Sequence, residues 1–468
     1  MDQLSPPPEP AAAVSARGAL PALSLAALLA ALGVSIANVA LPAIAADFAV
    51  PMRAAQWVVL AYLLTMTVVT LAAGRLGDRH GRRLVLTCGL ALFTAMSALA
   101  AVAPTLGVLI GARLGQGAGA AVMMALTIAM VRESVAADRT GRAMGLLGTM
   151  SAVGTALGPS AGGLLIAWGG WRAVFAVLVP LGGIAIVLAW RALPGDRPSP
   201  AAKRGEGPGG LLLAAALAFY SLAMTRAGIA TGAALVLAAV AATALFVIAE
   251  RRAAKPLLPP AMLNDPVVRE SLAMNVIVGT TMMTTLVVGP FYLSGALGLG
   301  AAEVGMVMAI GPAVAALSGV PAGRLTDRFG PKTITLAGLG EMAVAAVALA
   351  LLPLWLGVAG YALALATLTP GFQLFQAANN TAVMARAAVD ARGIAGALLS
   401  LSRNLGFITG ASLMGTVFAL AAGRGAVGAA APEALGFAFR ATFFLAAAML
   451  AGAFVLGWRR ARRPLCQS

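Results

Sequence analysis

A charged ten-residue segment occurs twice in this otherwise apolar chain. The first copy is Gly74–Arg83 (GRLGDRHGRR) and the second is Gly323–Lys332 (GRLTDRFGPK), with six of the ten positions identical. Glycines at the first and eighth positions permit a tight turn and close helix approach. One aspartate among several arginines, Asp78 or Asp327, can make charge-assisted hydrogen bonds that exchange partners when helices move. The repetition predicts an internal duplication with the same charged turn in each half.

Two arginines lie within apolar stretches. Arg113 is embedded in LIGARLGQGAGAA together with Gln116, and Arg403 is embedded in SRNLGFITG. A charged side chain at a bilayer centre costs roughly 2.5–3.5 kcal/mol or more, so both should face protein or water. Each arginine is therefore either a functional group on an ion or substrate pathway or a structural residue that donates to backbone carbonyls.

Carboxylates are scarce in the apolar stretches. Glu341 follows Lys332 by nine residues, which places it about 14 Å along a helix. A lone buried glutamate has a raised pKa and can exchange protons, although a peripheral one could pair with a neighbouring helix instead. Glu270 stands at the edge of another apolar stretch beside Arg269, where water could solvate it. One histidine and two cysteines cannot supply a metal cluster, and no P-loop motif is present.

Small residues recur in the stretch GTMSAVGTALGPSAGG. Gly154, Gly158 and Gly162 are spaced four residues apart and share one helix face, which permits very close helix packing. Pro159 removes a backbone donor and can bend the helix. Gly163 extends the small face. The alternative is a generic packing face without a further role.

Polar, aromatic and thioether side chains within the apolar stretches are candidates for lining a substrate path. They are Ser35, Asn38, Trp57, Tyr62, Met282, Met283, Phe372, Gln373, Gln376, Asn379 and Asn380. Gln376, Asn379 and Asn380 are spaced to share a helix face, and the methionines are adaptable in shape. Such a wall suits an apolar or neutral-polar organic molecule, and the alternative for each residue is helix–helix packing.

The elements that carry these residues follow from composition. Hydrophobic residues make up 60% of the 468 residues and charged residues 10%, and the mean hydropathy is +0.93. Soluble domains have about 25% charged residues, so most of this surface must face lipid. The net charge of +16 would suggest nucleic acid in a soluble protein. Here the basic residues gather in loops on one side, which indicates positive-inside orientation with both termini cytoplasmic and no nucleic-acid partner.

Fourteen membrane-spanning helices are predicted, and an even number places both termini on one side. Residues 1–192 are expected to form an N-terminal six-helix bundle, 193–209 a mobile cytoplasmic linker, 210–249 two inserted helices, and 250–468 a C-terminal six-helix bundle with a basic tail. Twelve spans is the alternative if the inserted pair is re-entrant. The expected spans are 20–44, 54–75, 84–103, 106–131, 141–167, 172–192, 210–227, 230–249, 267–294, 302–323, 333–352, 357–383, 392–421 and 435–458.

These motifs resemble the major facilitator superfamily. The charged segment is similar to that family's loop 2–3 signature, Arg113 and Gln116 match its fourth-helix motif, and Gly158–Pro159 resembles the antiporter signature of its drug:H+ exporters. The resemblance implies a proton- or substrate-coupling role for Arg113 and a latch role for the charged segments. The implied latch residues are Gly74, Asp78, Arg79, Gly81, Arg82, Gly323, Asp327, Arg328 and Gly330.

Further stretches resemble the fourteen-span drug:H+ antiporters of that superfamily. They are NVALP at 38–42, WVVLAY at 57–62, ERRAAKPLL at 250–258 and SRNLGFITG at 402–410. The resemblance implies a monomeric bacterial cell-membrane exporter of small molecules, neither an enzyme nor a cofactor protein, with a proton gradient as its energy source. Those exporters commonly carry an aspartate five residues before the Asn of NVALP, where this chain has Gly33. The alternative is therefore an uncoupled facilitator or a differently coupled exporter.

Overall fold

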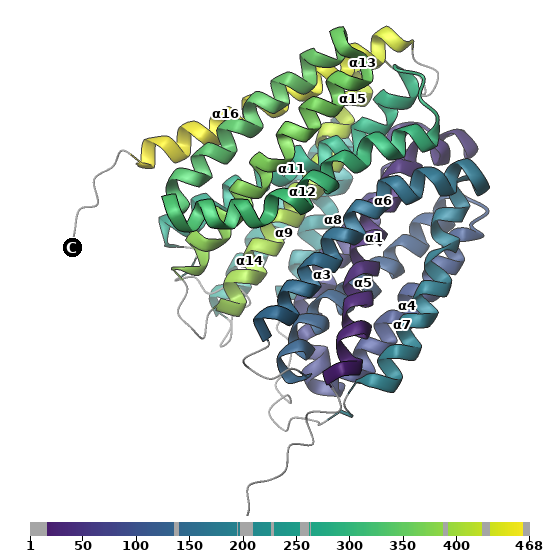
Figure 1. The fold of residues 1–468 in the computed structure, drawn as a ribbon, viewed down its shortest axis with the longest axis vertical. Helices are drawn as coiled ribbons and strands as arrows, with labels where there is room; N and C mark the ends of the chain where they lie inside the picture. The colour runs from purple at the N-terminus through teal and green to yellow at the C-terminus, as the bar shows by residue number, and fades with distance from the viewer. Residues whose placement is uncertain are drawn as a thin grey trace, which may run out of the picture.

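The part of the chain that the computed structural model describes is entirely helical in its regular elements (Figure 1). It comprises residues 16–134, 140–193, 195–196, 209–225, 229–252, 262, 264–386, 392–423 and 431–461. Within these ranges, 11 helices are long and apolar enough to cross a membrane. A membrane-embedded backbone must satisfy its hydrogen bonds internally, and helices achieve this within one segment. The expected all-helical membrane architecture is confirmed.

The first helices pack into one group, called here the N-half. Within it, α1 lies against α6, and α5 lies against both α3 and α4. The helix α6 leaves helical geometry at Gly169 and Gly170. The members of the N-half are α1 (Ala16–Asp47), α2 (Met52–Ala55), α3 (Trp57–His80), α4 (Arg82–Ala101), α5 (Leu106–Ser134), α6 (Thr140–Ala176) and α7 (Leu178–Ala192).

The last helices form a second group, the C-half. Here α11 lies against α14, and α13 lies against α12 and α16. The helix α13 is interrupted at Gly357, whose φ is 54° and ψ −129°. The members of the C-half are α11 (Pro266–Gly295), α12 (Ala301–Phe329), α13 (Pro331–Met384), α14 (Arg392–Thr409), the π-helical turn η4 (Gly410–Met414), α15 (Gly415–Ala421) and α16 (Pro432–Ala461).

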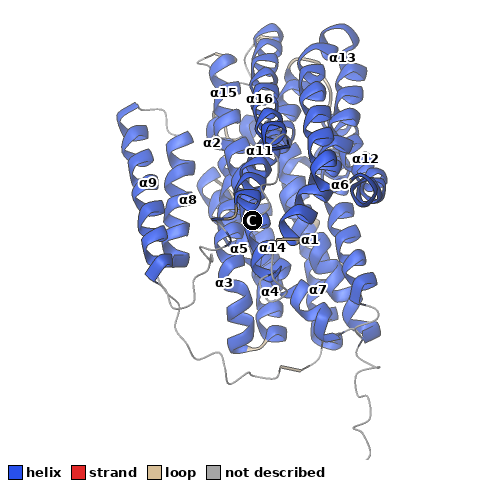
Figure 2. Ribbon diagram, turned by 90° about the vertical axis from the view of Figure 1, so that its left-hand side faces the viewer, coloured by secondary structure: helices blue, strands red, loops and turns tan. Residues whose placement is uncertain are grey.

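A helical hairpin stands beside the two halves. It consists of α8 (Gly209–Thr225) and α9 (Ile229–Arg252), and Figure 2 shows it set apart from the other helices. The inner member, α8, contacts α3 of the N-half together with α14 and η4 of the C-half. The Tyr220 hydroxyl on α8 donates to Thr409 Oγ1 on α14 at 2.9 Å. The hairpin therefore lies across the seam between the halves.

The two ends of the bundle are identified by their turns. Gly163, late in α6, meets Ala301 at the start of α12, so these two helices run antiparallel. The loops at Gly81 and Gly330 therefore lie at the same end, called the motif end, and the end that carries Asp47 and Gly357 is called the far end. Both motif-end glycines have positive φ, 100° for Gly81 and 81° for Gly330. A side chain at either position would be strained.

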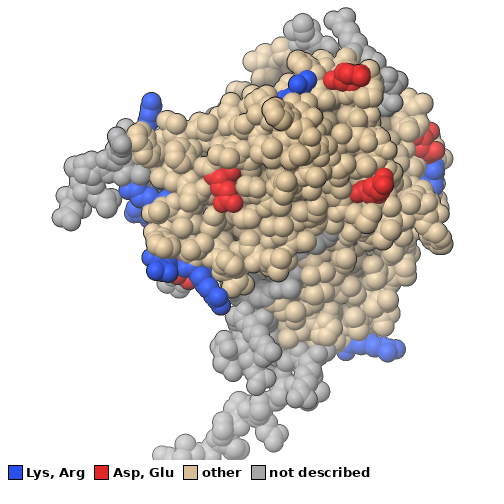
Figure 3. Space-filling model, turned by 45° about the horizontal axis from the view of Figure 1, so that its top comes forward, with Lys and Arg blue, Asp and Glu red and all other residues tan. Residues whose placement is uncertain are grey.

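The surface is that of a protein in lipid. Figure 3 shows one face on which few charged side chains are scattered over a broad uncharged area. Trp168 and Trp355, beside the far-end kinks, are 87% and 86% exposed, and Trp190 near the motif end is 68% exposed. Tryptophans at both ends of an apolar band are typical of the two membrane interfaces.

Candidate functional site

Arg113 is fully buried at the centre of the N-half and joins three of its helices. Its Nε donates to the Val58 carbonyl on α3 at 2.8 Å, and one terminal nitrogen donates to the Gly33 carbonyl on α1 at 3.0 Å. The other terminal nitrogen donates to Gln116 Oε1 on the same helix. Gln116 Nε2 in turn donates to Ser97 Oγ on α4 at 2.7 Å. The network therefore connects α1, α3, α4 and α5.

An aromatic ring completes the surroundings of this guanidinium. The Arg113 Cζ atom lies 4.2 Å from the centroid of the Tyr62 ring, a cation–π distance. The Tyr62 hydroxyl donates to the Ala30 carbonyl on α1 at 2.9 Å. Hydrogen-bond acceptors and a π face together solvate the cation. Every hydrogen-bond partner of Arg113 in the described part of the chain is a neutral group.

Gly33 participates in this network at the position where the resemblance to drug:H+ antiporters predicted an acid. Its carbonyl accepts from Arg113, so the backbone supplies the acceptor. A Cβ atom placed on Gly33 would lie 3.0 Å from the Tyr62 hydroxyl and 3.1 Å from Phe93 Cε2. The space beside Gly33 is thus filled by two aromatic side chains. These contacts correspond to the alternative in which Arg113 is a structural residue that donates to backbone carbonyls.

The glycine face of α6 packs directly on α1, as the four-residue spacing predicts. A Cβ atom on Gly154 would overlap the Leu28 carbonyl, and one on Gly158 would overlap Ser35 Oγ. A Cβ on Gly162 would lie 3.1 Å from Ile36 Cγ1. The close packing expected of this stretch is therefore present.

The next glycine of the stretch faces the other half. A Cβ atom on Gly163 would lie 2.5 Å from the Ala301 carbonyl oxygen and 2.9 Å from Gly305 Cα on α12. Conversely, a Cβ on Gly305 would overlap the Pro159 carbonyl. These are backbone atoms that cannot rotate away. Glycine at 163 and 305 is what lets the N-half and the C-half touch at the far end.

At the motif end, the first charged segment is held by an acid that lies far away in sequence. Asp196, just beyond α7, accepts from the backbone N–H of Arg83 at 2.7 Å and of Leu84 at 3.0 Å. The Arg83 guanidinium also donates to the Trp190 carbonyl. A Cβ atom on Gly81 would overlap the Asp196 carboxylate, so glycine is needed both for its φ and for this contact.

Asp196 lies in the stretch 193–209, which was predicted to be a mobile linker, and it contacts the first charged segment. Its carboxylate caps the N-terminus of α4, where unpaired backbone N–H groups and the helix dipole favour an anion. Four residues of this stretch are described: 193, 195, 196 and Gly209, the first residue of α8. The rest of the predicted linker lies outside the described residues. The sequence signal was weak, because the cap comes from another part of the chain.

Removing the Asp196 carboxylate is expected to loosen the first charged turn. Asp196→Ala leaves two N–H groups of α4 without their acceptor, and losing a cap typically costs about 0.5–2 kcal/mol. Amide hydrogen exchange at Arg83 and Leu84 should accelerate roughly fivefold, the equivalent of about 1 kcal/mol of local opening. Asp196→Asn, which keeps one acceptor oxygen, should show a smaller change. Unchanged exchange in the alanine variant would contradict the cap.

The remaining residues of the predicted latch are placed as follows. The side chain of Asp78 lies outside the described residues, and Gly74 is half-buried with open space around its Cβ position. Arg79 is exposed, and Arg82 is half-buried and has a partner. In the second copy, Gly323 is half-buried and Asp327 and Arg328 are exposed. The two copies share the glycine turn, while the described acid cap belongs to the first.

The substrate-path candidates are buried or half-buried, except Asn380, which is exposed. Ser35, Asn38, Tyr62, Met283 and Asn379 are buried, so they pack between helices in this conformation. Ser35 Oγ donates to the Gly154 carbonyl at 3.2 Å. The half-buried candidates are Trp57, Met282, Phe372, Gln373 and Gln376.

The face expected from the spacing of Gln376, Asn379 and Asn380 is not uniform. Asn379 is buried whereas Asn380 is exposed, so the three amides do not share one environment. Gln373 Nε2 donates to the Ala315 carbonyl on α12 at 3.2 Å. This contact ties one candidate to a neighbouring helix of the C-half.

The coupling candidates of the C-half occupy separate places. Glu341 is half-buried in the first part of α13, beside Gly340, whose Cβ position lies 3.5 Å from Phe454 of α16. Glu270 is half-buried near the motif end and has a partner. Arg403 is half-buried on α14, and its side chain makes no hydrogen bond, ion pair or ring contact within the described part of the chain.

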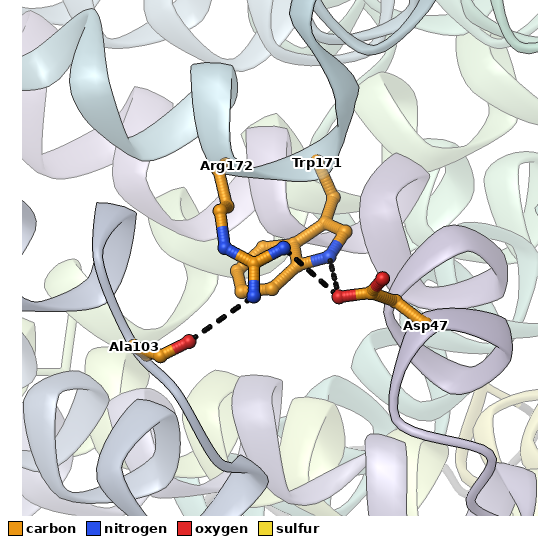
Figure 4. Close-up of polar contacts among 4 residues, drawn as sticks. All are labelled: Asp47, Ala103, Trp171 and Arg172. Atoms are coloured by element: carbon orange, nitrogen blue, oxygen red, sulfur yellow. Dashed lines mark hydrogen bonds and ion pairs between the residues drawn. The ribbon is translucent and has the colours of Figure 1, made fainter.

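A polar cluster at the far end was not singled out from the sequence (Figure 4). Asp47 at the end of α1 accepts from Trp171 Nε1 and from the Arg172 guanidinium, both at 2.9 Å. Arg172 also donates to the Ala103 carbonyl at 3.3 Å. The cluster joins α1, the α4–α5 loop and the kinked end of α6 within the N-half. No group of three or more metal-ligating side chains occurs among the described residues.

A family model described as Major Facilitator Superfamily matches residues 23–411. The chain belongs to the major facilitator superfamily. Members of this superfamily are transporters, so the chain is a multi-pass membrane transporter and not an enzyme. The paired charged turns and the close packing of α6 are therefore features of a protein that moves small molecules across a membrane.

Curated relatives include transporters of different cargo. The chain is 29% identical over 377 residues to the riboflavin transporter RibZ of Clostridioides difficile, covering 79% of this chain and 80% of the relative. It is 31% identical over 381 residues to the drug efflux pump JefA of Mycobacterium tuberculosis, covering 78% and 73%. It is 31% identical over 384 residues to the multidrug efflux pump LfrA of Mycolicibacterium smegmatis, covering 77% and 73%.

The fold also matches solved superfamily structures. A bacterial homologue of the human lysosomal transporter Spinster, in an inward-facing and occupied conformation, aligns with a TM-score of 0.70 at 17% identity, covering 97% of this chain and 98% of that one. At this identity the match supports the fold alone.

Proposed function

We propose that this chain exports a small organic compound by alternating access between its two halves. The observation that carries the proposal is the small face of α6, which packs on α1 through Gly158 and on α12 of the other half through Gly163. Substrate export requires the halves to close and separate at the far end in turn. The drug efflux pumps among the relatives support the same direction of transport.

Fourteen spans in a bacterial inner membrane, with both termini cytoplasmic and a monomeric chain, are part of this proposal. The helix α13 has 54 residues, and an unbroken helix of that length would measure about 81 Å, against a hydrocarbon core of about 30 Å. We propose that the kink at Gly357 separates two spans within α13, and that the kink at Gly169 and Gly170 separates the long part of α6 from its last six residues, which continue toward α7 as a further span. The hairpin of α8 and α9 is proposed to add a pair of spans between the two halves, with α9 long and apolar enough to cross a membrane.

The substrate we propose is apolar or neutral-polar. The half-buried candidates are a tryptophan, a methionine, a phenylalanine and two glutamines. Such groups offer apolar surface and amide hydrogen bonds rather than a compensating charge. The charged segments, including Gly74, Asp78 and Arg82, are proposed to act as latches at the motif end.

The energy source of the proposed export depends on whether protons are exchanged. Arg113 has neutral acceptors only, and Gly33 supplies a carbonyl where a proton-binding acid was expected. This observation favours the alternative of an uncoupled facilitator or a differently coupled exporter. If protons are exchanged, Glu341, Glu270 and Arg403 are the proposed participants.

Flux into proteoliposomes with and without an imposed pH gradient separates these modes. With riboflavin and ethidium as probes, antiport predicts that the gradient drives accumulation above equilibrium, and that Glu341→Gln or Glu270→Gln abolishes this drive while downhill exchange persists. Glu433→Gln, at the exposed start of α16, is the matched control. Flux of a transported probe that ignores the gradient at every pH would overturn antiport and leave the facilitator. If neither riboflavin nor ethidium is transported, the proposal that this chain exports such compounds is contradicted for both.

A further inference from the structure

We propose that Gln56 and Gly415 form a second far-end gate between the halves, and that the buried amide of Gln56 favours its opening. This inference rests on the proposed alternating access. It assigns a role in the transport cycle to two residues outside the glycine face of α6 and outside the Arg113 network.

The position of Gln56 is fixed by its backbone. It lies between α2 and α3, where its N–H donates to the Met52 carbonyl at 2.9 Å and its own carbonyl accepts from Val59 and Leu60 at 3.0 Å. The side chain is fully buried. The anchored backbone fixes where the side chain starts, and the amide at its end lies against Gly415 of the C-half.

The surface that receives this amide is a glycine. Gly415 begins α15, directly after the π-helical turn η4. A Cβ atom on Gly415 would overlap Gln56 Nε2 and would lie 2.8 Å from Gln56 Cδ and 3.2 Å from Oε1. A side chain at residue 415 would therefore displace the Gln56 amide from its place in the closed far end. A π-helical turn beside the contact is a frequent feature of functional sites in helices.

Within the described part of the chain, the closed contact leaves the amide without hydrogen bonds. Neither Gln56 Nε2 nor Gln56 Oε1 has a partner among these residues, although both atoms are buried. Burying a polar group without a partner costs free energy that exposure to water recovers. Opening the far end would hydrate the amide, so the closed contact is held by packing and opposed by the amide. Gln56 thus shifts the balance of the two states toward opening.

The contact lies on the opposite side of the bundle from the first far-end contact. Figure 2 shows α2 and α15 on one side and α6 and α12 on the other. In the α6–α12 contact, the positions that a Cβ on Gly163 or Gly305 would take lie closest to backbone atoms of the other helix. One side therefore closes through close backbone packing, and the other through a buried amide.

Distances across the far end of the full-length protein in lipid nanodiscs test the gate. Spin labels at the exposed positions Ala46 and Glu433, after Cys88→Ser and Cys466→Ser, report on the two halves independently of any substrate. Gly415→Ala should shift the distance distribution toward longer, far-end-open values and reduce ethidium flux at least about tenfold. Gln56→Leu, which removes the unpaired amide at similar volume, should shift the distribution toward the shorter, closed values.

The decisive variant combines two substitutions. Gln56→Ala/Gly415→Ala removes the group that the new Cβ would overlap, so the closed population should return to within about threefold of that in Gln56→Ala. Gly452→Ala on α16, whose Cβ position has no neighbour within 4 Å, should match the parent protein. A Gly415→Ala distribution like that of the parent, or failure of the double variant to recover, would overturn the gate. A distance shift without measurable flux would support the gate while counting against the proposed export.

Discussion

Replacing Arg113 with methionine is expected to lower thermal stability and to reduce transport at least about tenfold. The guanidinium connects carbonyls of α1 and α3 to Gln116 on α5. Leaving a buried acceptor unpaired costs about 1–3 kcal/mol, and Gln116 Oε1 would lose its partner. The N-half would then lose the cross-links that let it move as one body. Melting of the purified protein in detergent, followed with ethidium flux, measures both effects.

Arg113→Lys distinguishes a structural role from a coupling role. Lysine keeps the positive charge but cannot reproduce the planar fork that reaches three acceptors, nor the stacking on Tyr62. The structural role predicts a loss of stability close to that of the methionine variant. Arg269→Gln, at an exposed arginine of α11, should melt like the parent protein. An Arg113→Met protein with unchanged melting would contradict the cross-linking role.

Replacing Gly163 with valine is expected to hold the far end open. The new Cβ would lie 2.5 Å from the Ala301 carbonyl oxygen and 2.9 Å from Gly305 Cα. Overpacking of this kind costs about 1–3 kcal/mol, which changes the ratio of closed to open states roughly 5- to 150-fold. The Ala46–Glu433 distance distribution should lengthen, and flux should fall in the same proportion as the closed population.

Gly183→Val on α7 is the matched control, since a Cβ there has no neighbour within 4 Å. It places the same side chain on a helix of the same half without a contact across the halves. Wild-type distances in the Gly163→Val protein would show that α6 and α12 do not need to touch during transport, and the export proposal would lose its main support.

The two far-end contacts indicate how closure is balanced. In the α6–α12 contact two glycines allow the helices to pack closely. The contact of Gln56 with Gly415 buries an amide that has no hydrogen-bond partner among the described residues. A transporter must cross between states that differ by only a few kcal/mol, because a deep minimum would stop the cycle. Favourable packing on one side and an unfavourable amide on the other keep the closed state reversible. The Asp47 cluster meanwhile joins elements within the N-half, so it can persist when the halves separate.

Much of the fold could be predicted from the sequence because the signals are local. A composition with 60% hydrophobic residues requires lipid as solvent, and long apolar runs require helices. The spacing of Gly154, Gly158 and Gly162 predicted a close-packed helix face, since residues four apart share a face in any helix. The turns at Gly81 and Gly330 could also be predicted, because a glycine within each charged segment favours a turn whatever surrounds it.

The partners of these residues were decided only by the tertiary structure. Nothing near Arg113 in sequence indicates that the Gly33 carbonyl, 80 residues away, accepts its hydrogen bond. Asp196 caps α4 from beyond α7, and Gln56 meets Gly415 across the two halves. Helix periodicity fixes which face a residue occupies, but it does not fix which helix covers that face. That choice depends on how all the helices pack together, so the sequence alone determined the chemistry available and the packing determined where it is used.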